Sequence, residues 1–303
     1  MREFKHVFFR SIIYCLPVLS FYFYLEFRLS RLENSYSKKI KNFDSISAAC
    51  DVLILGNSQM LKGVNPDLLS ENAFNMAQVS QTLTVDKAIL ERFINKMPSL
   101  KVVVVGVGYT SFGEKLEKGD EAWRLSFYKA HYGLSLNPTF EVKDYSYTLR
   151  YQPYEALKLC LKNFKVDLIK GYQSNGWLKM QGIDSTKLSN DWAKRRAMLH
   201  TKSLTDESII ENKKALIDLI TIATQHRVRV ILVRPPVMSS YSKYLNLNWQ
   251  NCNATILNAI KKETGLEVLT FNLFGKEHGF NDVDHLNEEG AKAFSDRIAE
   301  VIK

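Results

Sequence analysis

Asp51-Val-Leu-Ile-Leu-Gly-Asn-Ser58-Gln-Met60 is the stretch that decides the fold. Residues 51–55 have the apolar run of a buried strand, and Gly56 and Asn57 then interrupt it. Ser58 therefore follows the end of a strand, and open parallel sheets bind ligands outside the carboxyl ends of their strands. The stretch predicts a serine that faces a substrate. A plain turn with helix-capping residues remains the alternative on these residues alone.

Strand and helix patterns alternate through the rest of the chain. Apolar, β-branched runs at 100–105, 228–233 and 266–271 predict further strands, and helical spacing at 85–97, 206–226, 248–263 and 288–302 predicts helices between and after them. Such alternation predicts an α/β fold with a doubly wound parallel sheet over residues 51–303. The stretch at about 113–205 breaks the alternation, and we interpret it as an inserted, mainly helical cap.

The first 28 residues are predicted to be a membrane anchor. Residues 11–25 carry no charge, and aromatic side chains cluster near their end, as at a membrane interface. The run is short of the roughly 20 residues that span a bilayer, so a cleaved signal peptide and a buried helix of a soluble protein remain alternatives. We expect a single-pass protein of the bacterial cytoplasmic membrane with its large domain on the periplasmic or extracellular side. Residues 29–50 are predicted to be a linker or stalk helix.

Composition and charge exclude several classes of protein. The 303 residues are 46% hydrophobic and carry a net charge of +9, but no zinc-finger spacing or nucleic-acid-binding motif accompanies the charge, so no nucleic-acid partner is predicted. The cysteines are far apart without a C-x-x-C pair, so neither a metal site nor a redox dithiol is expected. Gly106-Val-Gly108 does not complete a dinucleotide-binding motif, and no cofactor is predicted.

The C-terminal stretch Phe280-Asn-Asp-Val-Asp-His-Leu-Asn287 contains the groups that a nucleophilic serine requires. A serine hydroxyl needs a base to take its proton, and the base needs an acid to orient it. Two residues separate Asp282 from His285, so a tight turn can place the carboxylate on the imidazole. Asp284 is the rival carboxylate, and a simple polar turn before a helix is the alternative. The pattern predicts Ser58 as nucleophile, His285 as general base and Asp282 as its orienting acid.

With these residues in order, the chain resembles the SGNH (GDSL-type) hydrolase superfamily. Gly56-Asn57-Ser58 stands at the first block of that family, with Asn57 where many members have aspartate, and Asp282-Val-Asp-His285 stands at the last block. The resemblance covers about 51–112 and 206–303. It implies a flavodoxin-like three-layer sandwich and a role for Asn57 in binding the substrate.

The second and third blocks depart from the family pattern. Phe74-Asn75-Met-Ala-Gln-Val-Ser80 has Ser80 in place of the oxyanion glycine, and Gly106-Val-Gly108-Tyr109 has Gly108 in place of the oxyanion asparagine. The resemblance therefore implies oxyanion donors at the backbone N–H groups of Ser58 and Ser80. It leaves the third donor open, with Tyr109 as one candidate, and gives Asn75 a substrate-binding role.

The resemblance also bears on the substrate and the partners. With an N-terminal anchor, the chain is similar to membrane-anchored SGNH proteins of bacterial envelope gene clusters. This implies O-acyl transfer on an envelope polysaccharide or acyl-glycan, beside a multi-spanning membrane acyltransferase. A carbohydrate esterase or deacetylase is the nearest alternative, and a non-catalytic glycan-binding or scaffold protein is the alternative of another class. Arg234, at the end of a predicted strand, is a candidate for binding an anionic substrate group, or else a structural ion pair.

Overall fold

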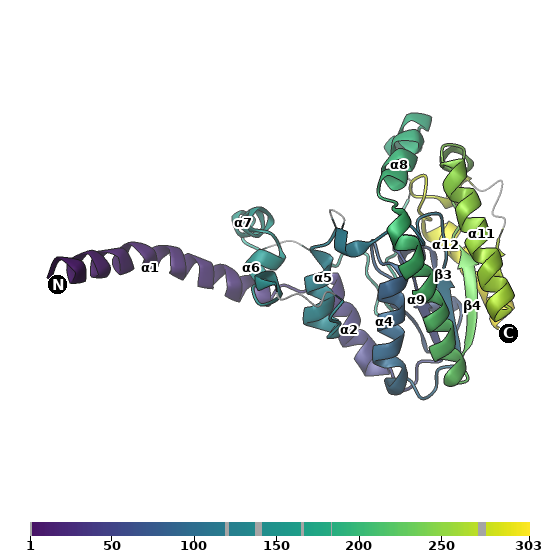
Figure 1. Ribbon diagram of the computed structural model, residues 1–303, viewed down its shortest axis with the longest axis horizontal. Coiled ribbons are helices and arrows are strands. Elements are labelled where there is room, and N and C mark those ends of the chain that lie inside the picture. The colour runs from purple at the N-terminus through teal and green to yellow at the C-terminus, as the bar shows by residue number, and fades with distance from the viewer. Residues whose placement is uncertain (1, 119–120, 137–140, 165–166, 183, 272–276) are drawn as a thin grey trace. The chain divides into compact units, whose positions relative to one another are not determined.

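The structure is a computed structural model that describes residues 2–118, 121–136, 141–164, 167–182, 184–271 and 277–303 (Figure 1). The chain forms two compact units. The larger consists of Lys39–Ala122 and Gly171–Lys303, and the smaller consists of Met1–Lys38 and Trp123–Lys170. The larger unit contains the sheet and all the residues of the candidate site.

A five-stranded parallel sheet organises the larger unit, in the order β2-β1-β3-β4-β5. The chain passes from β1 outward to β2 and then returns to the other side of β1, so the strand order reverses between β1 and β3. Ligands of doubly wound folds bind at this switch point. The predicted parallel α/β fold is therefore confirmed. The strands are β1 (Val52–Leu55), β2 (Ala73–Asn75), β3 (Val102–Gly106), β4 (Arg229–Arg234) and β5 (Val268–Thr270).

The central strands are apolar because helices cover both faces of the sheet. Every residue of β1 and β3 is buried, as expected for central parallel strands. Ile54 and Val104 share a core with Phe294 of the C-terminal helix α12, while α4 and α9 pack against each other (Figure 1). The helices of this layer structure are α3 (Ser58–Gly63), α4 (Leu83–Phe93), α9 (Asp206–Gln225), α11 (Leu247–Thr264) and α12 (Glu288–Ile302).

The insertion predicted at about 113–205 is divided between the two units. Its last part belongs to the sheet unit and forms α8 (Asn190–Lys202), which packs on the short helix α10 (Ser239–Ser242). Ala193 and Ala197 of α8 are completely buried in the same core as Ile54. One face of α8 is thereby fixed to the sheet unit, and this fixes where the rest of the helix points.

The smaller unit is helical. Glu26, near the end of α1, accepts hydrogen bonds from the Ser146 hydroxyl (2.6 Å) and from the backbone N–H groups of Tyr147 (2.8 Å) and Thr148 (2.9 Å). Although burial opposes ionisation of this carboxyl, these hydrogen bonds lower the pKa of Glu26 below its ordinary value. The α-helices of the unit are α1 (Arg2–Ser30), α5 (Arg124–Phe127), α6 (Tyr147–Arg150) and α7 (Pro153–Leu161).

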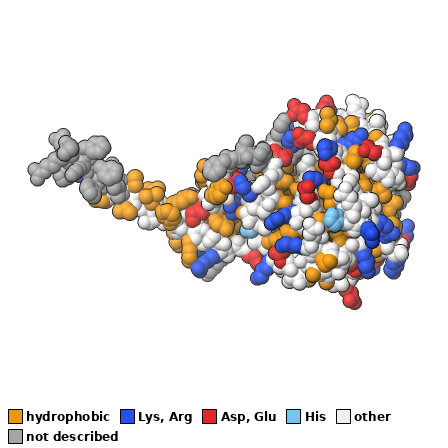
Figure 2. All heavy atoms as spheres, turned by 60° about the horizontal axis from the view of Figure 1, so that its bottom comes forward, with side chains coloured by type: hydrophobic (Ala, Val, Ile, Leu, Met, Phe, Trp, Pro, Cys, Tyr) orange, Lys and Arg blue, Asp and Glu red, His pale blue; other side chains and the backbone are white. Residues whose placement is uncertain are grey.

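The N-terminal segment is helical in two pieces. Among the described residues, no helix combines the length and the apolar character that crossing a bilayer requires, so the transmembrane helix predicted at 1–28 is not supported. Large apolar side chains of α1 are nevertheless exposed, among them Val18 (69%) and Phe23 (64%) (Figure 2). Within the stretch predicted as a linker or stalk, α2 (Ser35–Ile46) places Phe43 in a buried edge-to-face contact with Phe74.

Candidate active site

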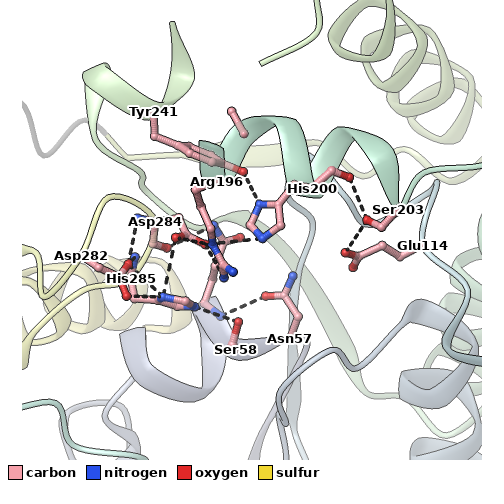
Figure 3. A network of polar contacts seen from close by, with 12 residues as sticks. Asn57, Ser58, Glu114, Arg196, His200, Ser203, Tyr241, Asp282, Asp284 and His285 are labelled. Atoms are coloured by element: carbon pink, nitrogen blue, oxygen red, sulfur yellow. Dashed lines mark hydrogen bonds and ion pairs between the residues drawn. The ribbon is translucent and has the colours of Figure 1, made fainter. Parts of the chain in front are cut away.

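Ser58, His285 and Asp282 form a continuous hydrogen-bonded relay (Figure 3). The Ser58 Oγ lies 2.9 Å from His285 Nε2, and His285 Nδ1 lies 2.9 Å from both carboxylate oxygens of Asp282. His285 is 4% exposed, so the relay is largely shielded from water. The structure thus brings together the three residues that the sequence selected, from two loops 227 positions apart.

Local hydrogen bonds fold the turn that carries the histidine. Asp282 Oδ1 accepts from the backbone N–H groups of Asp284 (3.1 Å) and His285 (2.9 Å), and the Asn281 N–H donates to the His285 carbonyl (2.9 Å). Burial by itself raises the pKa of Asp282, but the hydrogen bond and charge of His285 outweigh it, and the pKa is lowered. The carboxylate is therefore ionised at neutral pH and holds a proton on His285 Nδ1, which leaves Nε2 to accept the proton of Ser58.

Two neighbours of Ser58 fix the position of its loop. Gly56 has φ 131°, a conformation that only glycine adopts readily, and its N–H donates to the buried Asp86 carboxylate (2.9 Å). Asn57 caps α3, because its side-chain oxygen accepts from the Gln59 N–H (3.0 Å). Ser58 is consequently the first residue of α3. Its own N–H donates to no group in the described part of the chain.

Ser80 adopts a glycine-like backbone conformation with φ 56°. This explains physically why a glycine suits the position, since a side chain in this region costs about 1–2 kcal/mol. The Ser80 N–H has no acceptor among the described residues, so two backbone donors, those of Ser58 and Ser80, remain available to a ligand. Asp86 ties the two loops together, because its Oδ1 also accepts from Gln81 Nε2 (2.6 Å). Burial raises the pKa of Asp86 to about 7.

A cavity of about 560 Å³ lies over these residues. Side chains of the nucleophile loop, the Ser80 loop, the segment after β3 and helix α8 line it. The lining residues include Asn57, Ser58, Gln59, Ser80, Tyr109, Thr110, Glu114, Arg196, His200, Ser203, Tyr241 and Asp284. Polar side chains thus surround the nucleophile, while Val79, Leu116 and Leu199 give the same cavity an apolar part.

Helix α8 contributes a second polar network that reaches the relay (Figure 3). Arg196 binds the buried Asp284 with both Nε and Nη2. His200 Nδ1 pairs with the Tyr241 hydroxyl, and His200 Nε2 lies 3.9 Å from Asp284 Oδ2. Burial, with the charge of Arg196, lowers the pKa of His200 to about 4, and burial raises that of Tyr241. Both side chains are therefore neutral at pH 7, and His200 is a neutral hydrogen-bonding group in the cavity wall.

Glu114 is a carboxyl group in the cavity wall without a cation beside it in the described residues. Its side-chain partners are the hydroxyls of Thr110 and of Ser203, which donates to it at 3.5 Å. Burial raises the pKa of Glu114 to about 7. Neither Glu114 nor Arg196 nor His200 belongs to a sequence motif, and sequence reasoning missed all three. Their approach to Ser58 depends on how the insertion packs, which no local pattern reveals.

Three residues that the sequence selected for substrate binding or as an oxyanion donor either lie outside the cavity or have their polar groups engaged. Asn75 is completely buried outside the cavity, where its Nδ2 donates to the carbonyls of Met60 and Val64 (both 3.0 Å) and thereby ties β2 to α3. Arg234 is exposed at the end of β4 and does not line the cavity. Tyr109 lines it, but its hydroxyl is engaged by Thr201 and by a backbone N–H.

One group of possible metal ligands occurs among the described residues. Ligand atoms of Asp282, Asp284 and His285 lie within 4.8 Å of one another. Each already has a partner, because His285 Nδ1 faces Asp282 and the Asp284 carboxylate receives Arg196. This group is therefore accounted for by the relay.

Comparison with known proteins gives limited information. No family model and no curated protein matches the chain. Among solved structures, a GDSL-like lipase from Bacteroides thetaiotaomicron matches 88% of this chain and 99% of its own, with 13% identity and a TM-score of 0.38. Similarity at this level is too weak to assign a function. The chain's own fold and geometry carry the argument instead, since a Ser-His-Asp relay at the switch point of a parallel α/β sheet can activate a serine hydroxyl for attack on an acyl carbonyl.

Proposed function

We propose that this protein is an SGNH-type acyl-ester enzyme that transfers O-acyl groups on an envelope polysaccharide. The observation that carries the proposal is the relay, in which Ser58 Oγ and Asp282 lie at 2.9 Å on the two nitrogens of one imidazole. Because this geometry can remove the serine proton, Ser58 would attack an acyl carbonyl. The two available backbone N–H groups, of Ser58 and Ser80, would receive the negative charge that develops on its oxygen.

The reaction has two balanced halves. In the first, a bond forms between Ser58 Oγ and the acyl carbon, the serine proton moves to His285, and the donor's oxygen leaves as a hydroxyl with that proton. In the second, His285 takes the proton of a glycan hydroxyl, whose oxygen bonds to the acyl carbon; the bond from that carbon to Ser58 Oγ breaks, and His285 returns the proton to Ser58 Oγ. The polar cavity wall formed by Arg196, His200 and Ser203 supports a hydroxyl-rich acceptor. With water in place of the glycan, the same steps describe an esterase.

The test is an acyl-transfer assay with purified full-length protein, an aryl acetate as donor and oligosaccharides as acceptors. Transfer predicts acetylated oligosaccharide by mass spectrometry, lost in Ser58→Ala and kept in Ser45→Ala, which changes an exposed serine on α2. Release of acetate alone, with no acylated sugar, would assign the esterase reaction instead. No turnover of any ester would leave only a binding or scaffold role and would contradict the enzyme proposal.

The same proposal includes the location of the protein, which is at the bacterial cytoplasmic membrane with the catalytic unit outside. It also includes a membrane-bound acyltransferase as the source of acyl groups. The exposed apolar side chains of α1, such as Val18, Phe23 and Phe27, support a lipid-facing role for this helix. Vesicle flotation of the full chain tests it. Polar substitution of Val18 and Phe23 should release the protein from the vesicles, and unchanged flotation would contradict a role for α1.

A further inference from the structure

Gln59 occupies the space that Gly108 leaves empty. The ends of β1 and β3 are neighbours, since Leu55 pairs with Val105 in the sheet. The loops that follow these strands therefore meet beside Ser58. A Cβ atom on Gly108 would lie 2.9 Å from Gln59 Oε1, closer than real Cβ contacts. A side chain at 108 and the Gln59 carboxamide in its present position thus exclude each other.

The Gln59 carboxamide is held in one orientation. Its Nε2 donates to the Asp284 carbonyl (3.3 Å), and its backbone N–H is fixed by Asn57 Oδ1. One Nε2 hydrogen is used in this way. The other has no acceptor in the described part of the chain, although the side chain lines the cavity together with Ser58 and Ser80. An amide donor that is oriented in advance and has no protein acceptor is what a developing negative charge needs.

Two other candidates for this role, at Gly108 and Tyr109, are already engaged. The Gly108 N–H donates to the Ser111 hydroxyl (2.8 Å), and the Tyr109 hydroxyl is bound by Thr201 (2.9 Å). Asn57 also lines the cavity; its carboxamide oxygen serves as the cap of α3, but its Nδ2 has no acceptor among the described residues, so Asn57 is the rival donor that the Asn57→Ser variant tests. The Gln59 carboxamide is the group beside Gly108, with its Oε1 toward Gly108 and its Nε2 toward the Asp284 carbonyl.

We infer that Gln59 supplies the third oxyanion donor, in exchange for a side chain at Gly108. This inference rests on the proposed acyl-ester chemistry. When Ser58 Oγ bonds to the acyl carbon, the electron pair of the carbonyl bond moves to its oxygen. The N–H groups of Ser58, Ser80 and Gln59 Nε2 then donate to that oxygen. The pair returns when the leaving oxygen departs with the proton from His285.

Hydrolysis of p-nitrophenyl acetate by the full-length protein tests the inference. Removal of one oxyanion donor lowers kcat by about 10²–10³-fold, so Gln59→Ala should lose about 10²-fold in kcat with little change in KM. Gln225→Ala removes an exposed glutamine at the end of α9 and should have no effect. Circular dichroism and thermal melting of each variant exclude misfolding as the cause of a loss.

The decisive variants exchange the two positions. Gln59→Ala/Gly108→Asn places an amide on the other side of the same space and should recover at least about tenfold of the lost kcat, within the range of one donor. Gln59→Ala/Gly108→Ala fills the space without an amide and should recover nothing. Equal recovery in both doubles, or full kcat in Gln59→Ala, would overturn the inference. A larger loss in Asn57→Ser, which keeps a capping oxygen, than in Gln59→Ala would also overturn it.

The outcomes separate this inference from the proposed function. If the wild-type protein does not hydrolyse the ester and Ser58 takes no acyl group, the proposed function fails and the inference fails with it. If the wild type turns over through Ser58 and Gln59→Ala does so equally well, only the inference fails.

Discussion

Arg196 of α8 holds Asp284 of the catalytic turn, with Nε at 3.1 and 3.3 Å from the two carboxylate oxygens and Nη2 at 3.2 Å from Oδ2. Asp284 Oδ1 in turn lies 3.8 Å from His285 Nδ1. The insertion is therefore joined to the turn that carries the histidine. Because Arg196 compensates the charge of Asp284, the imidazole keeps Asp282 as its close partner.

Arg196→Ala should destabilise the protein, because it leaves a carboxylate that is 2% exposed without its cation. Breaking a buried pair costs about 3–5 kcal/mol, and the lower end applies here because the Arg196 side chain is 31% exposed. Urea unfolding measures the loss. Arg196→Ala/Asp284→Asn removes the uncompensated charge and should be more stable than Arg196→Ala. A double variant that is less stable would contradict this view of the pair.

Asp282→Asn should lower kcat by about 10³–10⁴-fold with the fold intact. The amide would donate toward His285 Nδ1 and would favour the tautomer with its proton on Nε2, which cannot accept the proton of Ser58. Steady-state ester hydrolysis measures the effect. Asp284→Asn keeps the tautomer and should lose far less in kcat. The reverse order of the two variants would make Asp284 the orienting acid.

The stability that Asp86 contributes should fall as pH rises from about 4 to about 7. The pKa of Asp86 is raised to about 7 by burial, above the roughly 3.9 of an unfolded aspartate. Between these values Asp86 is protonated in the folded protein and ionised in the unfolded chain, so its contribution to the free energy of unfolding decreases with pH and then levels off. Asp86→Asn keeps an acceptor for Gly56 and Gln81. It should remove this contribution, while Glu114, whose pKa is also about 7, and His200, whose lowered pKa has the opposite effect, keep theirs.

The control for the pH prediction is an exposed carboxylate, in Asp218→Asn on α9. This variant should keep the wild-type slope. Denaturant unfolding at pH 4.5, 6 and 8 gives the comparison. A difference in stability between the wild type and Asp86→Asn that stays constant over this range would show that Asp86 is ionised in the folded state at low pH.

Ser80→Gly should stabilise the protein by up to about 1 kcal/mol, since it removes a side chain from a left-handed backbone conformation. The gain is limited because glycine has more freedom in the unfolded chain. Ser80→Val should cost more than Ser80→Ala, because β-branched side chains are the most strained there. Thermal melting of the three variants checks the order. A Ser80→Gly protein less stable than Ser80→Ala would contradict backbone strain at this position.

The sequence predicted the sheet and the relay because both follow from local patterns. The apolar runs at Val52–Leu55 and Val102–Gly106 are buried on both faces, and the turn from Asp282 to His285 is closed by its own hydrogen bonds. Strand order then brings the carboxyl ends of the strands to one edge, so residues far apart in the chain meet. Such patterns are short and are visible without tertiary structure.

The rest of the site could not be predicted in this way. Asn75 stands where the family pattern has its asparagine, but its amide donates to the carbonyls of Met60 and Val64 and does not reach the cavity. Arg196 and His200 approach Ser58 only because the buried Ala193 and Ala197 fix α8. The position of the Gln59 carboxamide beside Gly108 depends on how the loops after β1 and β3 pack against each other. These properties arise from packing, which residue spacing does not encode.

The most direct test of the account is mass spectrometry of the folded, full-length protein after treatment with a fluorophosphonate. The account predicts one adduct per chain, on Ser58, and strongly slowed labelling in His285→Ala, because the imidazole activates the hydroxyl. Ser45→Ala should label as the wild type does. A folded protein that gains no adduct, or gains it on another residue, would contradict the claim that Ser58 is a nucleophile.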